Sequence, residues 1–259
     1  MLIKTLLVLF GFILIIIGAD LLVDGARNIA KKYRIPDVVI GLTIVSLGTS
    51  FPEIMITISS AKNDYHDLIF GNALGSNIVN LALILGIIAL IKPVHLDRDT
   101  KNVHLPLAVM ATAVLAFMGN GLIGGHLVIS RLEGWLLIAM SVVYFIVPAY
   151  KSLHRIQLSK QHSHPTADHI SVTKSVIYIV LGFIALKFGA DFAVDNAKII
   201  GETIGIPESI IGLTIVGMGT ALPELITSIT ATLKGTEGLA IGNLIGSCIL
   251  NLFLIIGLG

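Results

Sequence analysis

Residues 41–53 read GLTIVSLGTSFPE, and residues 212–224 read GLTIVGMGTALPE. A second pair follows in the same order, GNALGSNIVN at 71–80 and GNLIGSCILN at 242–251. Between 41–80 and 212–251, 17 of 40 positions are identical, and many of these are polar residues, Gly or Pro rather than apolar filler. Such identity at a fixed offset indicates an internal repeat.

The repeat extends over most of the chain. A shift of 171 residues aligns 11–88 with 182–259 without a gap, so that GFILIIIGAD at 11–20 returns as GFIALKFGAD at 182–191. A cleavable signal peptide would not need an internal copy. We therefore interpret the first apolar run as a membrane span.

Composition indicates a membrane protein. Hydrophobic residues make up 55% of the 259 residues and charged residues only 13%, against about 25% charged in soluble domains. Lys plus Arg (17) and Asp plus Glu (16) nearly cancel, which excludes a basic surface for nucleic acid, and the single Cys248 excludes a disulfide framework. A span needs about 20 apolar residues. Eight runs approach or exceed this length: 3–23, 36–61, 68–91, 105–123, 127–149, 175–196, 207–232 and 238–259.

Five of these spans fall within one repeat period, and an odd number of crossings makes the second copy enter the membrane from the opposite side. We therefore expect an all-α polytopic membrane protein with inverted repeats of five spans and helices broken at the midplane. The predicted parts are a first repeat at 1–150, a cytoplasmic loop at 151–174 and a second repeat at 175–259. The second repeat lacks copies of spans four and five, so we interpret the sequence as truncated. The loop contains His154, His162, His164 and His169, which we interpret as solvated rather than metal-binding.

The basic residues predict the orientation. Four Lys or Arg residues lie on the side of the N-terminus, twelve lie on the other side, and Lys187 lies within a span. Since basic loops stay in the cytoplasm, we expect the N-terminus outside the cell membrane.

Each repeat places a proline and a glutamate in the middle of a span. Pro52 and Pro223 remove a backbone N–H and break their helices. Glu53 and Glu224 follow directly, at a depth where a charge costs several kcal/mol unless a partner compensates it. No span offers two basic residues to neutralise both glutamates, whereas one divalent cation would. The alternative is a structural pair of protonated carboxyl groups.

Oxygen-bearing side chains accompany both glutamates. They are Thr49, Ser50, Ser76 and Asn80 in the first repeat, and Thr220, Ser247 and Asn251 in the second. Threonine and glutamate, like serine and asparagine, stand four residues apart and share a helix face. Oxygen donors with two carboxylates favour Ca²⁺ at about six to eight ligands. Na⁺ accepts the same donors, so competition between the two ions would allow exchange. For Ser76 and Ser247 the alternative is a hydrogen bond to the carbonyl four residues back.

The two GTxxPE segments, each followed by GNxxGSxxxN, resemble the α-repeats of the sodium/calcium exchanger family in the cation/calcium exchanger superfamily. The resemblance covers the whole chain, with the last two of the family's ten helices absent. It implies that Glu53 and Glu224 coordinate Ca²⁺ with help from Thr49 and Thr220. It also implies Na⁺ sites completed by the carbonyls of Ser46 and Gly217 with Ser50, Ser76 and Ser247, while Asn80 and Asn251 line the centre. By the same resemblance, the first and sixth helices slide over the rest in alternating access.

The sequence departs from the family pattern at three positions. Ala221 stands where the first repeat has Ser50, Asn251 stands where some relatives have aspartate, and Cys248 replaces the amide found at Asn77. The first change removes a hydroxyl ligand and the second lowers the negative charge. Both departures put the ion stoichiometry in question and leave the carboxylate pair in place.

The expected activity is antiport of Na⁺ and Ca²⁺, with these ions as cargo, membrane lipid as surroundings, no organic cofactor and no enzymatic chemistry. A calcium/proton exchanger is the main alternative, because two desolvated carboxylates without a cation take up protons. A passive cation channel and an intramembrane hydrolase are weaker alternatives. The inverted repeat disfavours the channel, and the hydrolase lacks a nucleophile.

Overall fold

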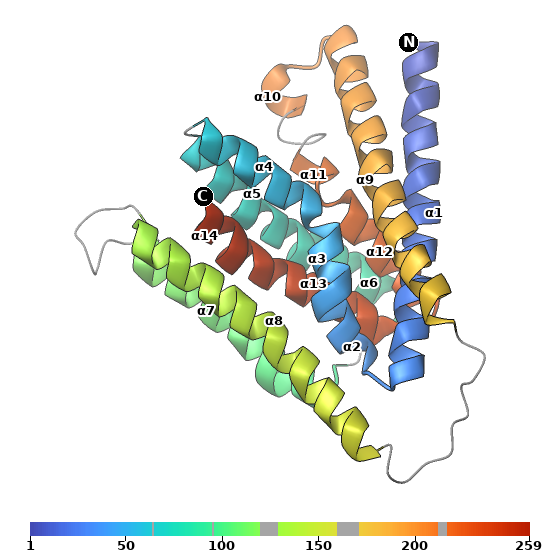
Figure 1. Cartoon of the computed structure of the whole chain (residues 1–259). Helices are drawn as coiled ribbons and strands as arrows, with labels where there is room; N and C mark the ends of the chain where they lie inside the picture. The colour runs from blue at the N-terminus through green and yellow to red at the C-terminus, as the bar shows by residue number, and fades with distance from the viewer. Residues whose placement is uncertain (64, 95, 120–128, 160–170, 212–216) are drawn as a thin grey trace.

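The computed structural model describes the chain except for residues 64, 95, 120–128, 160–170 and 212–216, and every regular element in the described part is helical (Figure 1). This confirms the predicted all-α class. The elements equivalent to the first repeat are α1 (Leu2–Tyr33), α2 (Asp37–Ile40), the π-helical turn η1 (Gly41–Val45), α3 (Ser46–Thr49), α4 (Phe51–Lys62), α5 (His66–Ile78), η2 (Val79–Ile84), α6 (Leu85–Ile91), η3 (Thr100–His104), α7 (Leu105–Gly119) and α8 (Arg131–Ser159). The second repeat contains α9 (Val172–Thr203), α10 (Glu208–Ile211), α11 (Gly217–Gly219), α12 (Leu222–Leu233), α13 (Glu237–Leu250), η5 (Asn251–Ile255) and α14 (Ile256–Leu258).

Five described helices are long and apolar enough to cross a membrane, and one further pair bends by 46° at its break. The five are Leu2–Tyr33, His66–Ile91, Arg131–Tyr150, Val172–Thr203 and Glu237–Leu258, and the bent pair is Asp37–Thr49 with Phe51–Lys62. They coincide with six of the eight predicted spans. Of the other two predicted spans, one contains α7, whose helix has 15 described residues, and one includes 212–216, outside the described residues.

The connection between the repeats is shorter than predicted. Helix α8 continues to Ser159 and α9 begins at Val172, so both ends of the predicted 151–174 loop are helical. The side chain of His154 and all of His162, His164 and His169 lie outside the described residues.

Helices α1 and α9 are equivalent elements of the two repeats, and they lie side by side in opposite directions (Figure 1). A Cβ added at Gly11 would lie 2.6 Å from the backbone nitrogen of Ala193, while one at Gly25 would lie 2.6 Å from the carbonyl oxygen of Ser175. Residue numbers thus rise along one helix as they fall along the other. Small residues allow this close approach. Antiparallel packing of two copies of one helix is the relation that inverted repeats predict.

Helix α13 and its extension occupy the centre of the bundle, with 94% of the most apolar window in Glu237–Leu258 buried. Gly242 and Gly246 pack against the backbone of α2 and η1 on one side. Gly257 packs against Gly134 of α8 on the other side. No atom of the described residues lies within 4 Å of a Cβ added at Gly71 or Gly75, the equivalent glycines of α5, and the residues equivalent to Leu42 and its neighbours lie in 212–216, outside the described residues. Close packing of a GxxxG pair is therefore observed at Gly242 and Gly246 of the second repeat.

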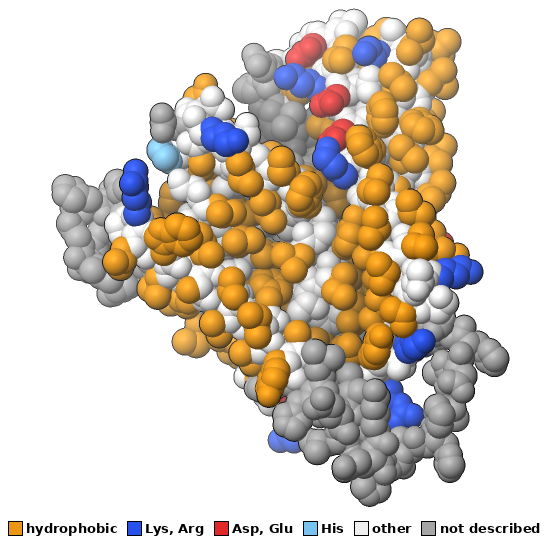
Figure 2. Space-filling model, in the orientation of Figure 1, with side chains coloured by type: hydrophobic (Ala, Val, Ile, Leu, Met, Phe, Trp, Pro, Cys, Tyr) orange, Lys and Arg blue, Asp and Glu red, His pale blue; other side chains and the backbone are white. Residues whose placement is uncertain are grey.

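Hydrophobic side chains cover the middle of the visible face, while many charged side chains lie toward its upper and lower ends (Figure 2). Exposed apolar residues occur along the long helices, for example Ile13 at 54% in α1 and Ile184 at 47% in α9. Exposed apolar side chains along the whole length of a helix are typical of contact with lipid rather than water.

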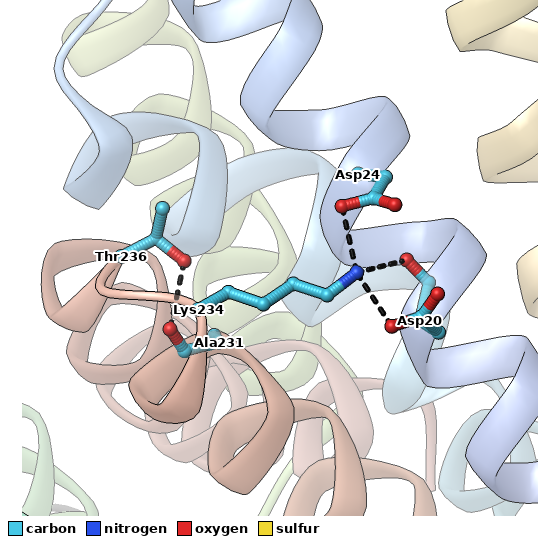
Figure 3. Close-up of polar contacts among 5 residues, drawn as sticks. All are labelled: Asp20, Asp24, Ala231, Lys234 and Thr236. Carbon is cyan, nitrogen blue, oxygen red and sulfur yellow. Dashed lines mark hydrogen bonds and ion pairs between the residues drawn. The ribbon is translucent and has the colours of Figure 1, made fainter.

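Lys234 joins the turn after α12 to α1 (Figure 3). Its Nζ forms ion pairs with Asp20 at 2.5 Å and Asp24 at 2.7 Å, and it donates to the Asp20 carbonyl oxygen at 3.2 Å. Gly235, with φ 72°, allows the chain to reverse directly after the lysine. Asn63 occupies the equivalent position of the first repeat and donates to Ser59 of its own helix. The tie is therefore specific to the second repeat.

Replacing Lys234 with Gln should lower the unfolding temperature slightly. Burial alone would lower the pKa of Lys234, but Asp20 and Asp24 outweigh it and the pKa lies above its usual 10.5. The tie contributes fully below the unfolded pKa and is lost as pH rises through the higher folded pKa. Solvent screening of the exposed aspartates limits the contribution to about 1 kcal/mol or less.

Thermal unfolding in detergent between about pH 8 and pH 11.5 checks this, because the range brackets the ordinary lysine pKa. The difference between wild type and Lys234→Gln should shrink at the alkaline end. Asn63→Gln is the matched control and should show a constant small difference. A Lys234→Gln difference that grew with pH would contradict the assigned role of the tie.

Candidate functional site

Both predicted helix breaks occur where the prolines stand. In the first repeat α3 ends at Thr49 and α4 begins at Phe51, and in the second α11 ends at Gly219 and α12 begins at Leu222. Each proline is therefore in the first turn of a helix, where its missing N–H costs no hydrogen bond within the helix. Each glutamate follows in the same turn, at the positive end of the helix dipole, which favours a carboxylate.

The two glutamates are buried and lie close enough for their charges to interact. The exposed fraction of each is 1%, although α4 and α12 come from opposite repeats. Lys187, the one basic residue predicted inside a span, pairs with Asp191 on its own helix. Among the described residues, no lysine or arginine forms an ion pair with Glu53 or Glu224. Two neighbouring buried carboxylates without a basic partner are costly and call for a positive charge.

Hydroxyl groups surround the carboxylates. Ser50 of the first repeat donates to Oε1 of Glu224 at 3.1 Å, and Ser247 donates to the same oxygen at 3.5 Å. The Ser76 side chain lies beside the carboxylate of Glu53. All three serines are buried. The contacts of Ser76 and Ser247 favour a place in the site over the alternative of a bond to the preceding turn.

Two further asparagines bond across the repeats, and the sequence did not single them out as site residues. Asn243 accepts from the hydroxyl of Thr49 at 3.0 Å and donates to Ser228 at 3.1 Å. Asn77 accepts from the Asn251 amide at 3.0 Å. The sequence feature that could have identified Asn243 is its equivalence to Asn72 in the repeat. An asparagine repeated in this way is also typical of a residue that packs between helices. Asn77 had no such signal because its equivalent is Cys248.

Among the described residues, four buried carboxylate or amide oxygens have no hydrogen-bond donor. They are Oε2 of Glu53, Oε2 of Glu224, Oδ1 of Asn80 and Oδ1 of Asn251. They form two equivalent pairs, one carboxylate and one amide oxygen from each repeat. A buried acceptor without a donor is costly, and a bound cation is a group that could compensate such oxygens. The hydroxyls of Thr57 and Thr227, within about one turn of the glutamates, are also buried and unpartnered.

The remaining predicted site residues have no described hydrogen bond to the carboxylate of either glutamate. The Ser46 carbonyl accepts the backbone N–H of Ser50 at 3.0 Å, and its hydroxyl donates to the Leu42 carbonyl at 2.6 Å. Gly217 begins α11, and Thr220 is half-buried in the turn between α11 and α12. Ala221 is 2% exposed, so the hydroxyl that Ser50 supplies in the first repeat has no counterpart in the second.

The donor set is hard and contains oxygen only. Within the described residues, no group of three or more His, Cys, Asp or Glu side chains could hold a metal ion. Two carboxylates combined with amide and hydroxyl oxygens suit Ca²⁺ or Na⁺ and not zinc or copper.

A hollow of about 300 Å³ reaches toward the second helix break. Its lining includes Ala193, Val194, Ala197, Met218, Gly219 and Leu222. The first-repeat equivalents of Ala193, Val194 and Ala197 are Leu22, Val23 and Ala26 of α1. These three α1 residues are completely buried. The surface next to the second helix break is thus hollowed beside α9, whereas the equivalent residues of α1 are packed.

Comparison with known proteins gives consistent matches. The family model described as sodium/calcium exchanger protein matches residues 3–149 and 174–259. The chain is 36% identical to the putative antiporter CaxA of Alkalimonas amylolytica, with 100% of this chain and 81% of the relative covered. It is 34% identical to the inner membrane protein YrbG of Escherichia coli, with 100% and 79% covered, and 30% identical to the sodium/calcium exchanger MaX1 of Methanosarcina acetivorans, with 99% and 82% covered.

The fold agrees as well. A solved structure of the sodium-calcium exchanger NCX_Mj, soaked with Na⁺ and Sr²⁺, superposes with a TM-score of 0.86 at 28% identity. The match covers 99% of this chain and 81% of the solved chain. The helices broken at Pro52 and Pro223, the antiparallel repeats and these matches lead to one conclusion: the chain belongs to the sodium/calcium exchanger family of integral membrane antiporters, which are transporters and not enzymes.

Proposed function

We propose that this chain exchanges Na⁺ for Ca²⁺ across the membrane, with both ions competing for a midplane site between Glu53 and Glu224. The observation that carries the proposal is the set of four buried, donor-less oxygens, one carboxylate and one amide oxygen from each repeat. One Ca²⁺ would neutralise both carboxylates and satisfy these four acceptors together. The side chains of Thr49, Thr220, Ser50, Ser76 and Ser247, with the carbonyls of Ser46 and Gly217, complete the proposed ligand set.

Competition gives exchange its physical basis. A site with two negative charges is neutralised by one Ca²⁺ or by two Na⁺, so each cargo displaces the other by mass action. The hydroxyls that border Glu224 can coordinate Na⁺ but do not transfer protons readily, which favours Na⁺ over H⁺ as the counter-ion. Proton coupling remains the second candidate, because each glutamate retains a buried unpartnered oxygen that can be protonated.

Alternating access follows from the repeat symmetry. The hollow beside α9, where the equivalent residues of α1 are buried, supports unequal arrangements of the two repeats, as a site open toward one side would require. Exchanging the roles of the two repeats would open the other side. We further propose that the protein lies in the cell membrane with its N-terminus outside. An N-terminal tag that reacts only with reagents on the cytoplasmic side would contradict that orientation.

Purified protein in liposomes tests the proposed activity. Vesicles loaded with Na⁺ and diluted into Na⁺-free buffer with tracer Ca²⁺ should accumulate Ca²⁺, and added external Na⁺ should release it. Vesicles with equal Na⁺ on both sides are the control and should show no net uptake. Uptake driven by a pH gradient and indifferent to Na⁺ would replace the sodium assignment with proton exchange. Ca²⁺ flux without any counter-ion would indicate a channel.

A further inference from the structure

The side chain of Asn77 connects the two repeats next to the proposed cation site. Asn77 is in α5 of the first repeat, whereas Asn251 and Cys248 are in the second. The Nδ2 group of Asn251 donates to Oδ1 of Asn77 at 3.0 Å. The Nδ2 group of Asn77 donates to the backbone carbonyl of Cys248 at 3.2 Å. The three residues form a directed chain of hydrogen bonds.

The direction of this chain is fixed at its end. A backbone carbonyl only accepts hydrogen bonds, so the Cys248 carbonyl must face the Nδ2 end of Asn77. The Oδ1 end of Asn77 then faces Asn251 and selects the Nδ2 end of that amide. Consequently the Oδ1 of Asn251 is turned away from Asn77, and it is one of the four buried oxygens without a donor.

Orientation matters because an amide has two opposite ends. With Oδ1 toward the site, Asn251 offers a partial negative charge to a cation, whereas a reversed amide would place N–H donors there and repel it. The two orientations have nearly the same shape, so packing alone discriminates weakly between them. A hydrogen-bond partner of defined polarity is the physical means to select one.

The second repeat has no amide at the equivalent position. Cys248 stands there, beside Asn80, and a thiol is a weak donor and a weak acceptor. Asn80 is the equivalent of Asn251 and also presents a buried, donor-less Oδ1. Only Asn251 is therefore oriented by a second amide, that of Asn77, whereas its equivalent Asn80 is not.

We propose that Asn77 is a positioning residue, which holds the Asn251 amide with its oxygen toward the cation and so raises Ca²⁺ affinity. The inference rests on the proposed function, which places the cation beside Asn251. A carboxylate has oxygen at both ends and needs no such selection. An exchanger with aspartate at position 251 would therefore not depend on Asn77.

The test compares Asn77→Cys in two backgrounds. Asn77→Cys gives the first repeat the residue of the second, and in the wild-type background it should weaken equilibrium Ca²⁺ binding about tenfold, the effect of one lost charge-assisted contact. In the Asn251→Asp background a carboxylate oxygen would face the Asn77 oxygen without a donor between them, so the same substitution should not weaken Ca²⁺ binding. Equal losses in both backgrounds would show a merely structural role and overturn the inference.

Two controls separate the possible failures. Unfolding temperatures in detergent identify a variant that misfolds, and Asn77→Ser, whose hydroxyl is too short to reach Asn251, replaces Asn77→Cys in that case. Glu53→Gln tests the site itself. Normal Ca²⁺ binding by Glu53→Gln would overturn the proposed function, whereas loss of binding there with normal binding by Asn77→Cys would overturn only the inference about Asn77.

Discussion

Glu53→Gln and Glu224→Gln should each lower Ca²⁺ affinity by roughly 100-fold or more and remove Na⁺-driven Ca²⁺ uptake. Truncating one member of a buried charge pair costs about 2–5 kcal/mol, and each 1.4 kcal/mol is a factor of ten in affinity. Glutamine keeps the size of the side chain, so packing is preserved. It removes one of the two negative charges that face the cation. Equilibrium Ca²⁺ binding and tracer uptake measure the effect.

The unfolding temperature measured without Ca²⁺ distinguishes the loss of a charge from misfolding. Without Ca²⁺, each variant relieves the repulsion between two buried carboxylates and should unfold at the same temperature as wild type or higher. Addition of Ca²⁺ should raise the unfolding temperature of wild type only. Glu202→Gln, which removes an exposed pair with Lys198 at 3.8 Å, is the control and should bind Ca²⁺ normally. Undiminished uptake by either site variant would remove both glutamates from the ligand set.

Gly242→Ala should destabilise the protein by about 1–3 kcal/mol or more, as overpacking of a close-packed contact does. The added methyl group would lie 2.2 Å from the Val38 carbonyl oxygen and 2.8 Å from the Leu42 nitrogen. Both are backbone atoms, so α13 would have to move away from α2 and η1. Thermal unfolding in detergent and the yield of folded protein measure the effect.

Gly71→Ala is the matched control because Gly71 is the equivalent residue of the first repeat. No atom of the described residues lies within 4 Å of its added Cβ, and alanine favours a helix over glycine by about 1 kcal/mol. We expect this variant to be neutral or slightly more stable. Equal destabilisation by the two substitutions would indicate that Gly71 is packed as closely as Gly242, contrary to this expectation.

The local features of the fold could be predicted from the sequence. Proline at positions 52 and 223 removes a backbone donor, and the helices break there. The offset of 171 residues and the odd number of spans predict inverted repeats, and α1 packs antiparallel to α9. These features depend on the backbone chemistry of proline and on whether the number of spans in a repeat is odd or even. The order of residues alone determines both.

The contacts between the repeats could not be predicted in the same way. Whether Asn243 packs against a helix or accepts from Thr49, 194 positions away, depends on how α13 meets α3. Gly242 packs closely because α2 and η1 cover α13, and the motif that it shares with Gly71 does not by itself indicate this contact. The orientation of Asn251 depends on Asn77, where the repeats differ in sequence. Repetition identifies equivalent residues but does not determine their surroundings.

Anomalous diffraction from crystals of the protein grown with Ca²⁺ tests the central claim most directly. We expect one strong peak between the two glutamates, within about 2.3–2.6 Å of an oxygen of each, which weakens as Na⁺ in the soak is raised. A Ca²⁺ peak that contacts one glutamate only, or that lies away from both, would contradict the shared site.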